Sequence, residues 1–285
     1  MIAELECIPC LVRQAREMAV MTAEDDSERM RIVRKCLAFM SETDLKKSPP
    51  EIMQGIGELI TKSTGVEDPY SDIKTIHTEK ALAMLPEMDR IVDEAENRFE
   101  AGLRLAIAGN IIDLGARTEV ADEDITNTLH EAIHEPLVGT RPGILEEQVR
   151  KAHRILYLAD NAGESVFDRK FLQQFPGNRT TVAVRGAPAL NDATLEDAKR
   201  AGLHEVARLI SNGSGAPATV LSDCSPEFVS EFEKADVIIA KGQGNYESLS
   251  GTKANIFFLF RVKCSLVANH SGFPEGSLVI LRAGE

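Results

Sequence analysis

The sequence predicts an α/β protein with a helical N-terminal part, and three observations support this prediction. Apolar residues in about the first hundred positions recur at helical spacing. In the second half, short apolar runs rich in β-branched residues alternate with helical stretches. A chain of 285 residues is also long enough to bury a sizeable core, either as one large domain or as a core domain with a smaller partner.

The N-terminal part contains several helix candidates. The segments "CIPCLVRQAREMAVM" and "SERMRIVRKCLAFMSE" have helical apolar spacing. The segment "SPPEIMQGIGELITKSTG" begins with Ser-Pro-Pro, a typical helix entry, and ends near Gly65. The segment from Asp72 to Asn110 continues the pattern, and we expect Pro86 to separate or kink two helices. We therefore expect a helical N-terminal domain over residues 1–100.

Five short apolar runs predict the strands of a sheet: "RILYLA", "TTVAVR", "ADVIIAKG", "FFLFRV" and "SLVIL". Helical stretches such as "SVFDRKFLQQF" and "ATLEDAKRAGL" separate most of them. Because the runs are continuously apolar and do not alternate, they indicate a parallel sheet covered on both faces. We therefore expect a Rossmann-like three-layer α/β sandwich with a mostly parallel sheet over residues 101–285.

Polar side chains cluster where these runs end, and open parallel sheets bind ligands at the carboxyl ends of their strands. We also interpret "LRLAIAGNIIDLG" as an apolar run of this kind. A single cluster fits an ordinary turn about as well as a site. Several clusters, one of which adds a lysine and a glutamate, favour a site. In chain order the clusters are Asn110 and Asp113; Asp160, Asn161 and Glu164; Arg185, Asn191 and Asp192; Lys241, Gln243, Asn245, Tyr246 and Glu247. The fourth predicted strand, "FFLFRV", is expected to contain Arg261 and Lys263 itself.

These side chains have the chemistry of a metal-assisted phosphoryl site. Asp160, Asn161 and Asp192 supply hard oxygen ligands, which suit Mg, Mn or similar divalent ions. Two carboxylates leave coordination positions open for water and a substrate phosphate. Lys241 and Lys263 add positive charge for anionic oxygens. Phosphoryl transfer depends mainly on positioning and charge neutralisation, and this set provides both.

At these residues the sequence resembles the DUF89 proteins, also called ARMT1-like damage-control phosphatases. The resemblance spans nearly the whole chain, through "CIPC", "GNIIDLG", "DNAGE", "RGAPALND", "KGQGNYE" and "RVKC" in that order. The Cys-x-x-Cys near the start and the Lys-Cys near the end resemble the mostly microbial first subfamily. The resemblance implies a three-layer α/β core with a helical accessory domain. It also implies metal-dependent hydrolysis of phosphate esters, favouring sugar phosphates or damaged phosphometabolites and nucleotides.

The resemblance also implies roles for individual residues. The family's metal triad falls on Asp160, Asn161 and Asp192, with Mn, Ni, Co or Mg as the ion. Whether Asp160 also acts as a nucleophile that forms an aspartyl-phosphate is left open. The expected catalytic residues are Asp160, Asn161, Lys241 and Lys263. The expected substrate-binding residues are Asn110, Glu164, Asn191, Gly242, Asn245 and Tyr246.

The chain departs from the family's eukaryotic members at two places. Their late basic motif is Arg-Thr-x-Lys, whereas this chain has Arg261-Val262-Lys263, so the role of Lys263 is less closely matched. Their Lys-Gly loop continues with Asp-Leu, whereas this chain has Gln243-Gly244. This loop contacts the substrate in the family, so the resemblance does not define the substrate.

Three alternative functions compete with the phosphatase. "HEAIH" from His130 to His134 matches the H-E-x-x-H pattern of zinc metalloproteases. Pro136 ends that helix early, however, so we interpret the pattern as an amphipathic helix. An S-adenosylmethionine-dependent methyltransferase would need a Gly-rich loop after the first strand, and "AGN" is not one. The third alternative is a metal- or nucleotide-binding module without turnover.

Composition limits the partners. The net charge of -13 argues against a broad nucleic-acid surface. No segment approaches the roughly 20 apolar residues that span a bilayer. The N-terminus "MIAELECIPC" has acids where a signal peptide has bases. We therefore expect a cytoplasmic protein whose partner is a small phosphorylated metabolite, with no nucleic acid and no membrane. The sequence predicts no oligomeric state.

Five scattered cysteines fit a reducing compartment. Cys7 and Cys10 form the one close pair. On a helix they can both face the hydrophobic core of the protein; alternatively they act in redox chemistry or supply half of a zinc site. We favour the structural interpretation.

Overall fold

The computed structural model describes residues 1–109 and 129–284, and these contain a seven-stranded sheet. The strand order is β1-β7-β6-β5-β2-β3-β4, and every neighbouring pair is parallel except β6 and β7. The predicted α/β class with a mostly parallel sheet is therefore confirmed. The strands are β1 (Leu137–Gly139), β2 (Ile155–Leu158), β3 (Thr180–Val184), β4 (Arg208–Ser211), β5 (Val237–Lys241), β6 (Ile256–Arg261) and β7 (Leu278–Arg282).

The centre of the sheet is β2, which is buried along its whole length. Tyr157 belongs to a hydrophobic cluster with α6 (Arg98–Ala108), α9 (Pro142–Lys151) and α10 (Glu164–Leu172). Leu158 belongs to one with α12 (Pro226–Lys234), α13 (Gly242–Leu249) and α14 (Ser265–Ser271). Alternate side chains of β2 thus enter opposite helical layers, as a three-layer sandwich requires. Leu158 lies opposite both Ala183 of β3 and Ala240 of β5, so the residues after these three strands emerge at the same edge.

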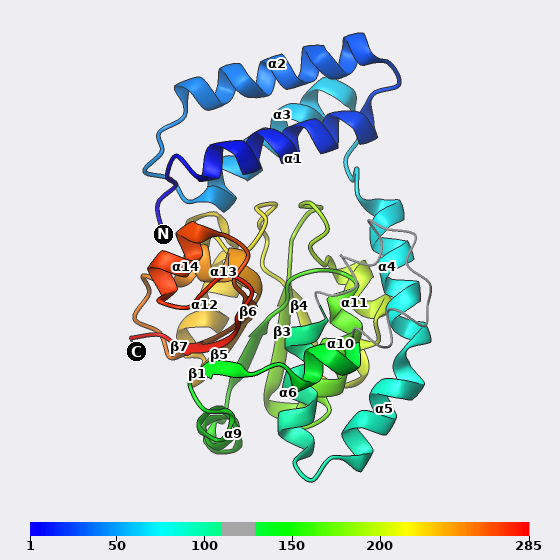
Figure 1. The fold of residues 1–285 in the computed structure, drawn as a ribbon, viewed down its shortest axis with the longest axis vertical. Helices are drawn as coiled ribbons and strands as arrows, with labels where there is room; N and C mark the ends of the chain where they lie inside the picture. Colours follow the sequence, from blue (N-terminus) through cyan, green and yellow to red (C-terminus); the bar gives the residue numbers. More distant parts are fainter. Residues whose placement is uncertain (110–128, 285) are drawn as a thin grey trace.

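The sandwich helices are short and surround the sheet (Figure 1). Their starts match common capping signals: for example, Ser225 accepts a hydrogen bond from the backbone of Phe228 at the start of α12, where Pro226 follows. They are α9 (Pro142–Lys151), α10 (Glu164–Leu172), α11 (Leu195–Arg200), α12 (Pro226–Lys234), α13 (Gly242–Leu249) and α14 (Ser265–Ser271), with 3₁₀ turns at Gly177–Arg179, Leu203–Glu205 and Leu221–Asp223.

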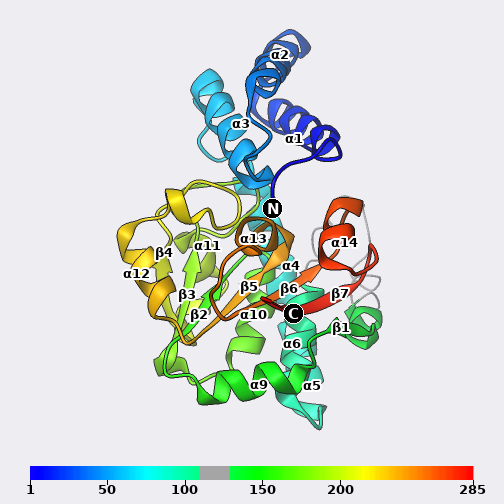
Figure 2. The same cartoon turned by 90° about the vertical axis from the view of Figure 1, so that its left-hand side faces the viewer.

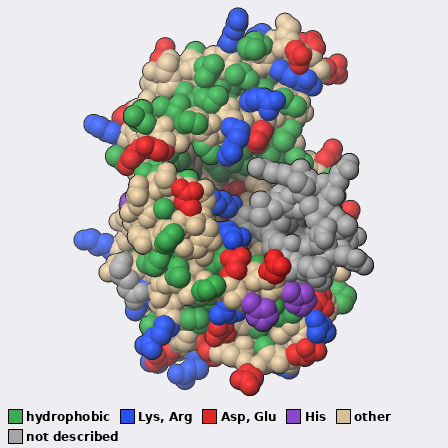
Figure 3. Space-filling model, in the orientation of Figure 1, with side chains coloured by type: hydrophobic (Ala, Val, Ile, Leu, Met, Phe, Trp, Pro, Cys, Tyr) green, Lys and Arg blue, Asp and Glu red, His purple; other side chains and the backbone are tan. Residues whose placement is uncertain are grey.

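Three N-terminal helices form a unit with its own hydrophobic cluster: α1 (Cys7–Thr22), α2 (Asp26–Glu42) and α3 (Pro49–Thr64). Ser48 and Glu51 form a capping box at the start of α3, and Gly65 ends it with a φ of 76° in the left-handed region. Figure 1 and Figure 2 both show this unit set apart above the sheet. Several of its apolar side chains remain exposed, and Figure 3 shows hydrophobic side chains gathered over it.

The N-terminal unit is anchored to the loops at the carboxyl edge of the sheet. Leu190, which follows β3, packs against its hydrophobic cluster. Gln54 of α3 donates a 2.9 Å hydrogen bond to Asp223, which follows β4. The Met1 amino group donates to the backbone oxygen of Glu247 in α13. The unit therefore contacts the edge where polar residues cluster in the sequence.

Helices α4 (Ser71–Ala83), α5 (Leu85–Glu94) and α6 (Arg98–Ala108) share a hydrophobic cluster with α10 of the sandwich. Pro86 lies in the first turn of α5, so it separates two helices as predicted. The predicted domain boundary near residue 100 stays a prediction.

One predicted strand is wrong, and the helical pattern that was predicted over the same segment is confirmed. The run "LRLAIA" lies in α6, which is a helix buried on nearly all sides. Such a helix lacks a polar stripe, so its sequence cannot be distinguished from that of a buried strand. Asn110 and Asp113, which follow this run, lie outside the described residues.

Two strands were not predicted. β1 has only three residues, and β4 is a partly exposed edge strand, so neither produces an apolar run. Among the described residues, no helix has both the length and the apolar character needed to cross a membrane.

Candidate active site

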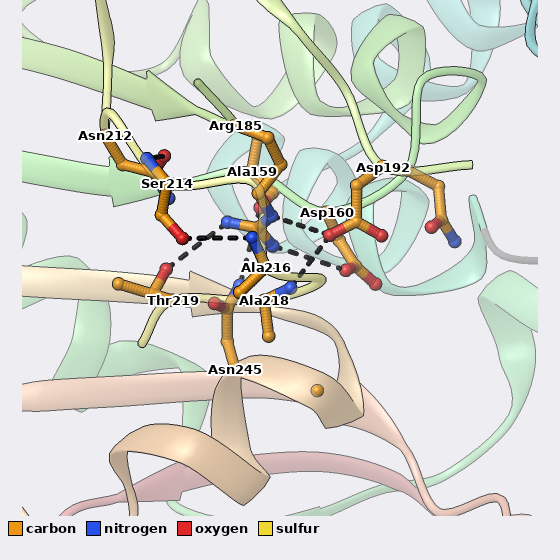
Figure 4. A network of polar contacts seen from close by, with 12 residues as sticks. Ala159, Asp160, Arg185, Asp192, Asn212, Ser214, Ala216, Ala218, Thr219 and Asn245 are labelled. Carbon is orange, nitrogen blue, oxygen red and sulfur yellow. Dashed lines mark hydrogen bonds and ion pairs between the residues drawn. The ribbon is translucent and has the colours of Figure 1, made fainter. Parts of the chain in front are cut away.

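The three residues predicted to bind a metal lie together at the carboxyl edge of the sheet. Asp160 and Asn161 follow β2, and Asp192 follows β3. An isolated antiparallel bridge pairs Asn161 with Asp192, and the backbone N–H of Ala193 donates a 2.8 Å bond to the backbone oxygen of Asp160. These backbone contacts hold the two segments side by side. The carboxylates of Asp160 and Asp192 therefore face one another (Figure 4).

Arg185, at the end of β3, links the two carboxylates (Figure 4). Its Nε donates a 2.6 Å bond to Asp192 Oδ2, and its Nη2 lies 3.8 Å from Asp160 Oδ1. Its Nη1 donates to Thr219 Oγ1 at 3.3 Å. The backbone N–H of Ala218 also donates to Asp192 Oδ2, at 2.9 Å. The sequence showed Arg185 at a strand end but gave it no role.

The electrostatics of the acid pair fit a cation site. Burial raises the pKa of Asp160 well above its usual value, and the charges of Asp192 and Glu164 raise it further. Arg185 and Lys263 lower that pKa but do not cancel the rise. The pair thus carries excess negative potential in a buried place, which a divalent ion would relieve. The donor set of two carboxylates and an amide suits such an ion.

The side chain of Asn161 is oriented by Glu164. Its Nδ2 donates a 3.0 Å hydrogen bond to Glu164 Oε1. Because the nitrogen faces Glu164, the amide oxygen is the atom that can hold an ion. Among the described residues, no three side chains drawn only from His, Cys, Asp and Glu are grouped to hold a metal. The candidate set differs because one of its three ligands is an amide.

Gly242 brings the end of β5 directly against Asp160. Its φ of 80° lies in the left-handed region, and a Cβ at this position would be 1.9 Å from Asp160 Oδ2. Any other residue would collide with the carboxylate and strain the backbone. The glycine at this position is therefore a requirement of the site's geometry.

Lys241 lies behind the acid pair in a buried ionic network. Its Nζ lies 2.5 Å from Asp168 Oδ1 and 3.3 Å from Glu164 Oε2, and the Tyr157 hydroxyl donates to Asp168 at 2.7 Å. Burial lowers the pKa of Lys241, but the charges of Asp168 and Glu164 outweigh that effect and raise it overall. Lys241 is therefore a fixed cation. Asp168 was not predicted from the sequence, although it lies one helical turn after Glu164 in α10.

Lys263 lies on the exposed side of the site. Its backbone N–H donates a 2.8 Å bond to Gln243 Oε1, so the loop after β6 is tied to α13. Its ammonium group is close enough to Asp160 for its charge to lower the pKa of that carboxyl. Lys263 follows β6 and does not lie within it, contrary to the sequence-based prediction.

Asn245 and Tyr246 make structural contacts in α13. Asn245 is fully buried and donates a 2.6 Å bond from Nδ2 to the backbone oxygen of Lys241. The hydroxyl of Tyr246 lies 2.7 Å from His270 Nδ1, and its ring stacks on Phe260 at 4.8 Å between centroids. The structure thus places the Tyr246 hydroxyl between α13 and α14.

The backbone oxygen of Asn191 accepts a hydrogen bond from the backbone N–H of Ala162, and Asn110 lies outside the described residues.

The H-E-x-x-H pattern lies elsewhere. His130 Nε2 contacts Glu87 Oε1 at 2.5 Å, and His130 and His134 line a cavity of about 640 Å³ with residues of α5 and α6. No third ligand joins them among the described residues, so a zinc protease site is not assembled there.

All five cysteines are free, and burial is the main cause that raises the pKa of Cys7.

Comparison with known proteins identifies close relatives. The model of the damage-control phosphatase ARMT1-like domain matches residues 3–279. A damage-control phosphatase of Pyrococcus horikoshii is 33% identical over 98% of this chain and 97% of its own. A damage-control phosphatase of Archaeoglobus fulgidus is 30% identical over 96% of each chain. The crystal structure of a DUF89 family protein from Pyrococcus horikoshii matches with a TM-score of 0.92, 33% identity and 99% of both chains covered.

Proposed function

The chain belongs to the family of damage-control phosphatases with an ARMT1-like domain, and from this premise we propose that it hydrolyses phosphate esters of small metabolites at the edge where β2, β3 and β5 end. The observation that carries this location is the meeting of Asp160, Asn161 and Asp192 beside Arg185. Sugar phosphates and damaged phosphometabolites or nucleotides are the substrate classes we expect.

Asp160, Asn161 and Asp192 would hold a divalent ion, which we propose to be Mn, Ni, Co or Mg. When bound, such an ion polarises a phosphate ester and activates water. Its positive charge would also balance the negative charges of Asp160 and Asp192. Because these carboxylates are buried, keeping them ionised without a cation is costly.

The chain's own cations would receive the phosphate. Lys263 is exposed next to the acid pair, so we propose that its ammonium group binds phosphoryl oxygens. Lys241 is fixed by Asp168 and Glu164, so it supplies positive potential without moving. The N-terminus of α13 begins at Gly242 against Asp160, and its backbone N–H groups favour an anion in the same place.

We propose that Glu164 and Asn191 form the substrate side of the site together with Asn110, which lies outside the described residues. For Asn245 and Tyr246 their contacts support a different role. Their bonds to Lys241 and His270 hold α13, and with it Gly242, in position.

We further propose a cytoplasmic location, because five free cysteines fit a reducing compartment. The net charge of -13 supports a small metabolite, and not a nucleic acid, as the partner.

The first prediction tests the acid pair. After chelation, the protein is assayed for phosphate release from phosphorylated sugars and nucleotides with each of the four ions. Asp192→Asn keeps the size of the side chain and its contact with Arg185 but removes one negative charge. We expect turnover to fall by about 100-fold or more.

Glu231→Gln is the matched control, because Glu231 forms an exposed ion pair with Arg208 on the surface. Its turnover should equal that of the wild type. Undiminished phosphate release by a folded Asp192→Asn protein would overturn the proposed site.

A further inference from the structure

We propose that Arg185 is a positioning residue for the metal ion: it holds one carboxylate oxygen of Asp192, so that the other is presented toward Asp160. This inference rests on the proposed function, because it concerns the same acid pair. Arg185 acts through Asp192 and does not itself bind the ion or the substrate.

The contacts of Asp192 are one-sided. Both hydrogen bonds to its carboxylate, from Arg185 Nε at 2.6 Å and from the Ala218 N–H at 2.9 Å, end on Oδ2. In the described part of the chain, no donor engages Oδ1. The carboxylate cannot rotate without breaking a charge-assisted bond, so the same oxygen always faces the site.

Arg185 is itself immobilised. Its residue exposure is 2%, and Nη1 donates to Thr219 Oγ1 at 3.3 Å. Its backbone N–H donates to the oxygen of Ala193 at 2.9 Å. The remaining nitrogen, Nη2, is buried, has no hydrogen-bond partner among the described residues, and lies 3.8 Å from Asp160 Oδ1. The planar guanidinium thus keeps both acids in a fixed relation.

The loop that supplies the second donor is also preorganised. Ala218 has a φ of 72°, an uncommon conformation for a residue with a Cβ, and it persists only where the surroundings enforce it. Asn212 Oδ1 accepts from the N–H of Gly186 at 3.0 Å and of Ser214 at 2.9 Å. The Ser214 hydroxyl accepts from Ala216 at 3.0 Å. This network fixes the turn that directs the Ala218 N–H at Asp192.

Two effects of Arg185 on a divalent ion have opposite signs. Its charge repels the ion, so charge alone predicts tighter binding when Arg185 is removed. Positioning predicts weaker binding, because two buried carboxylates without a fixed cation repel each other and rotate apart. Removing an outer partner of a metal ligand typically costs 10–100-fold in affinity. We therefore expect the ion to bind more weakly when Arg185 is replaced.

The test is a Mn²⁺ titration of the full chain, followed by electron paramagnetic resonance or calorimetry. Arg185→Lys keeps the charge but loses the planar fork, and Arg185→Met loses both. We expect the Kd for Mn²⁺ to rise about tenfold in the first variant and more in the second. Thr219→Val, which removes one anchor of Arg185 and keeps all charges, should raise it by a smaller factor and gives a readout if the other variants do not fold.

Arg169→Lys is the control, because Arg169 pairs with Glu205 at 2.6 Å and not with the acid pair. Its Kd should equal that of the wild type. In Arg185→Lys, phosphate release should recover when Mn²⁺ is raised above the new Kd, which a general folding defect would not allow.

An unchanged Kd in Arg185→Lys and Thr219→Val, or tighter Mn²⁺ binding in Arg185→Met, would overturn the inference. The proposed function would remain intact in that case if the wild type binds Mn²⁺ and Asp192→Asn does not. Absence of Mn²⁺ binding by the wild type would overturn both.

Discussion

At the scale of single residues, Gly242 shows how closely the site is packed. A Cβ at this position would lie 1.9 Å from Asp160 Oδ2, and the φ of 80° is unfavourable for any L residue with a side chain. The methyl group of an alanine would push the carboxylate away from Asp192. The glycine thus determines where Asp160 points.

The prediction for Gly242→Ala is a loss of metal binding with a smaller loss of stability. The left-handed backbone alone costs about 1–2 kcal/mol in the free energy of unfolding. The displaced carboxylate should weaken Mn²⁺ binding by about tenfold or more. Calorimetry and urea denaturation measure the two effects. Gly251→Ala, where no atom lies within 4 Å of the added Cβ, is the control. Wild-type Mn²⁺ affinity in Gly242→Ala would contradict this account.

The sequence predicted which residues meet at the candidate metal site but not the residues that hold them. Asp160, Asn161 and Asp192 follow strands that are visible as apolar runs, so their meeting at one edge follows from the parallel sheet. Arg185 and Asp168 were missed as partners because their pairing depends on side-chain direction in the folded chain. No spacing in the sequence distinguishes such a residue from an ordinary charge next to a strand or on a helix.

At the scale of elements, Lys74 connects α4 with two other parts of the chain. Its Nζ lies 2.7 Å from Asp68, in the loop after α3, and 2.9 Å from Asp197 in α11. The side chain of Lys74 is only 4% exposed. This buried network fixes the connection that leads from the N-terminal unit into the sandwich.

We expect Lys74→Met to lower the free energy of unfolding by about 3 kcal/mol at neutral pH, because it leaves two carboxylates without their cation. Lys62→Met removes an exposed pair with Glu58 and should cost less than about 1 kcal/mol. Urea denaturation of both variants measures the difference. Equal losses in the two variants would show that the buried network is not stabilising.

The Lys74 network also predicts a pH dependence. Burial lowers the pKa of Lys74, but its bonds to Asp68 and Asp197 outweigh burial and raise the pKa above the ordinary value of 10.5. The stabilisation is therefore complete below that value and is lost as the pH rises through the higher folded pKa. The difference in unfolding free energy between the wild type and Lys74→Met should shrink above about pH 10.5. A difference that stays constant to pH 12 would exclude this linkage.

The elements that the sequence predicted correctly are those with a strong pattern. The buried strands β2, β3, β5 and β6 are continuous apolar runs. Helices α1 to α3 have helical periodicity, and α2 and α3 also have start signals. The edge strands β1 and β4 lack such a run because neither is buried on both faces. Helix α6 was partly misassigned because burial removed its polar face.

At the scale of the whole molecule, the candidate site is formed by the segments that follow β2, β3 and β5, and the N-terminal unit contacts the same edge of the sheet. A ligand that binds only the folded chain stabilises all of it, by about 2.7 kcal/mol at a hundred times its Kd. For a chain of this size we expect a Tm increase of about 5 °C with saturating Mn²⁺. Differential scanning calorimetry with and without a chelator measures it. Asp192→Asn should show no such increase, and an equal increase in that variant would place the ion elsewhere.

The order of the strands has a consequence for how the protein is made. Asp160 follows β2, Asp192 follows β3 on one side of β2, and Gly242 follows β5 on the other side. In the chain β4 lies between β3 and β5, but in the sheet it lies at the far edge beside β3. During synthesis on the ribosome, the carboxylates emerge long before the segment that closes around them. A nascent chain released before β5 therefore exposes two acids without the Gly242 segment that packs against Asp160.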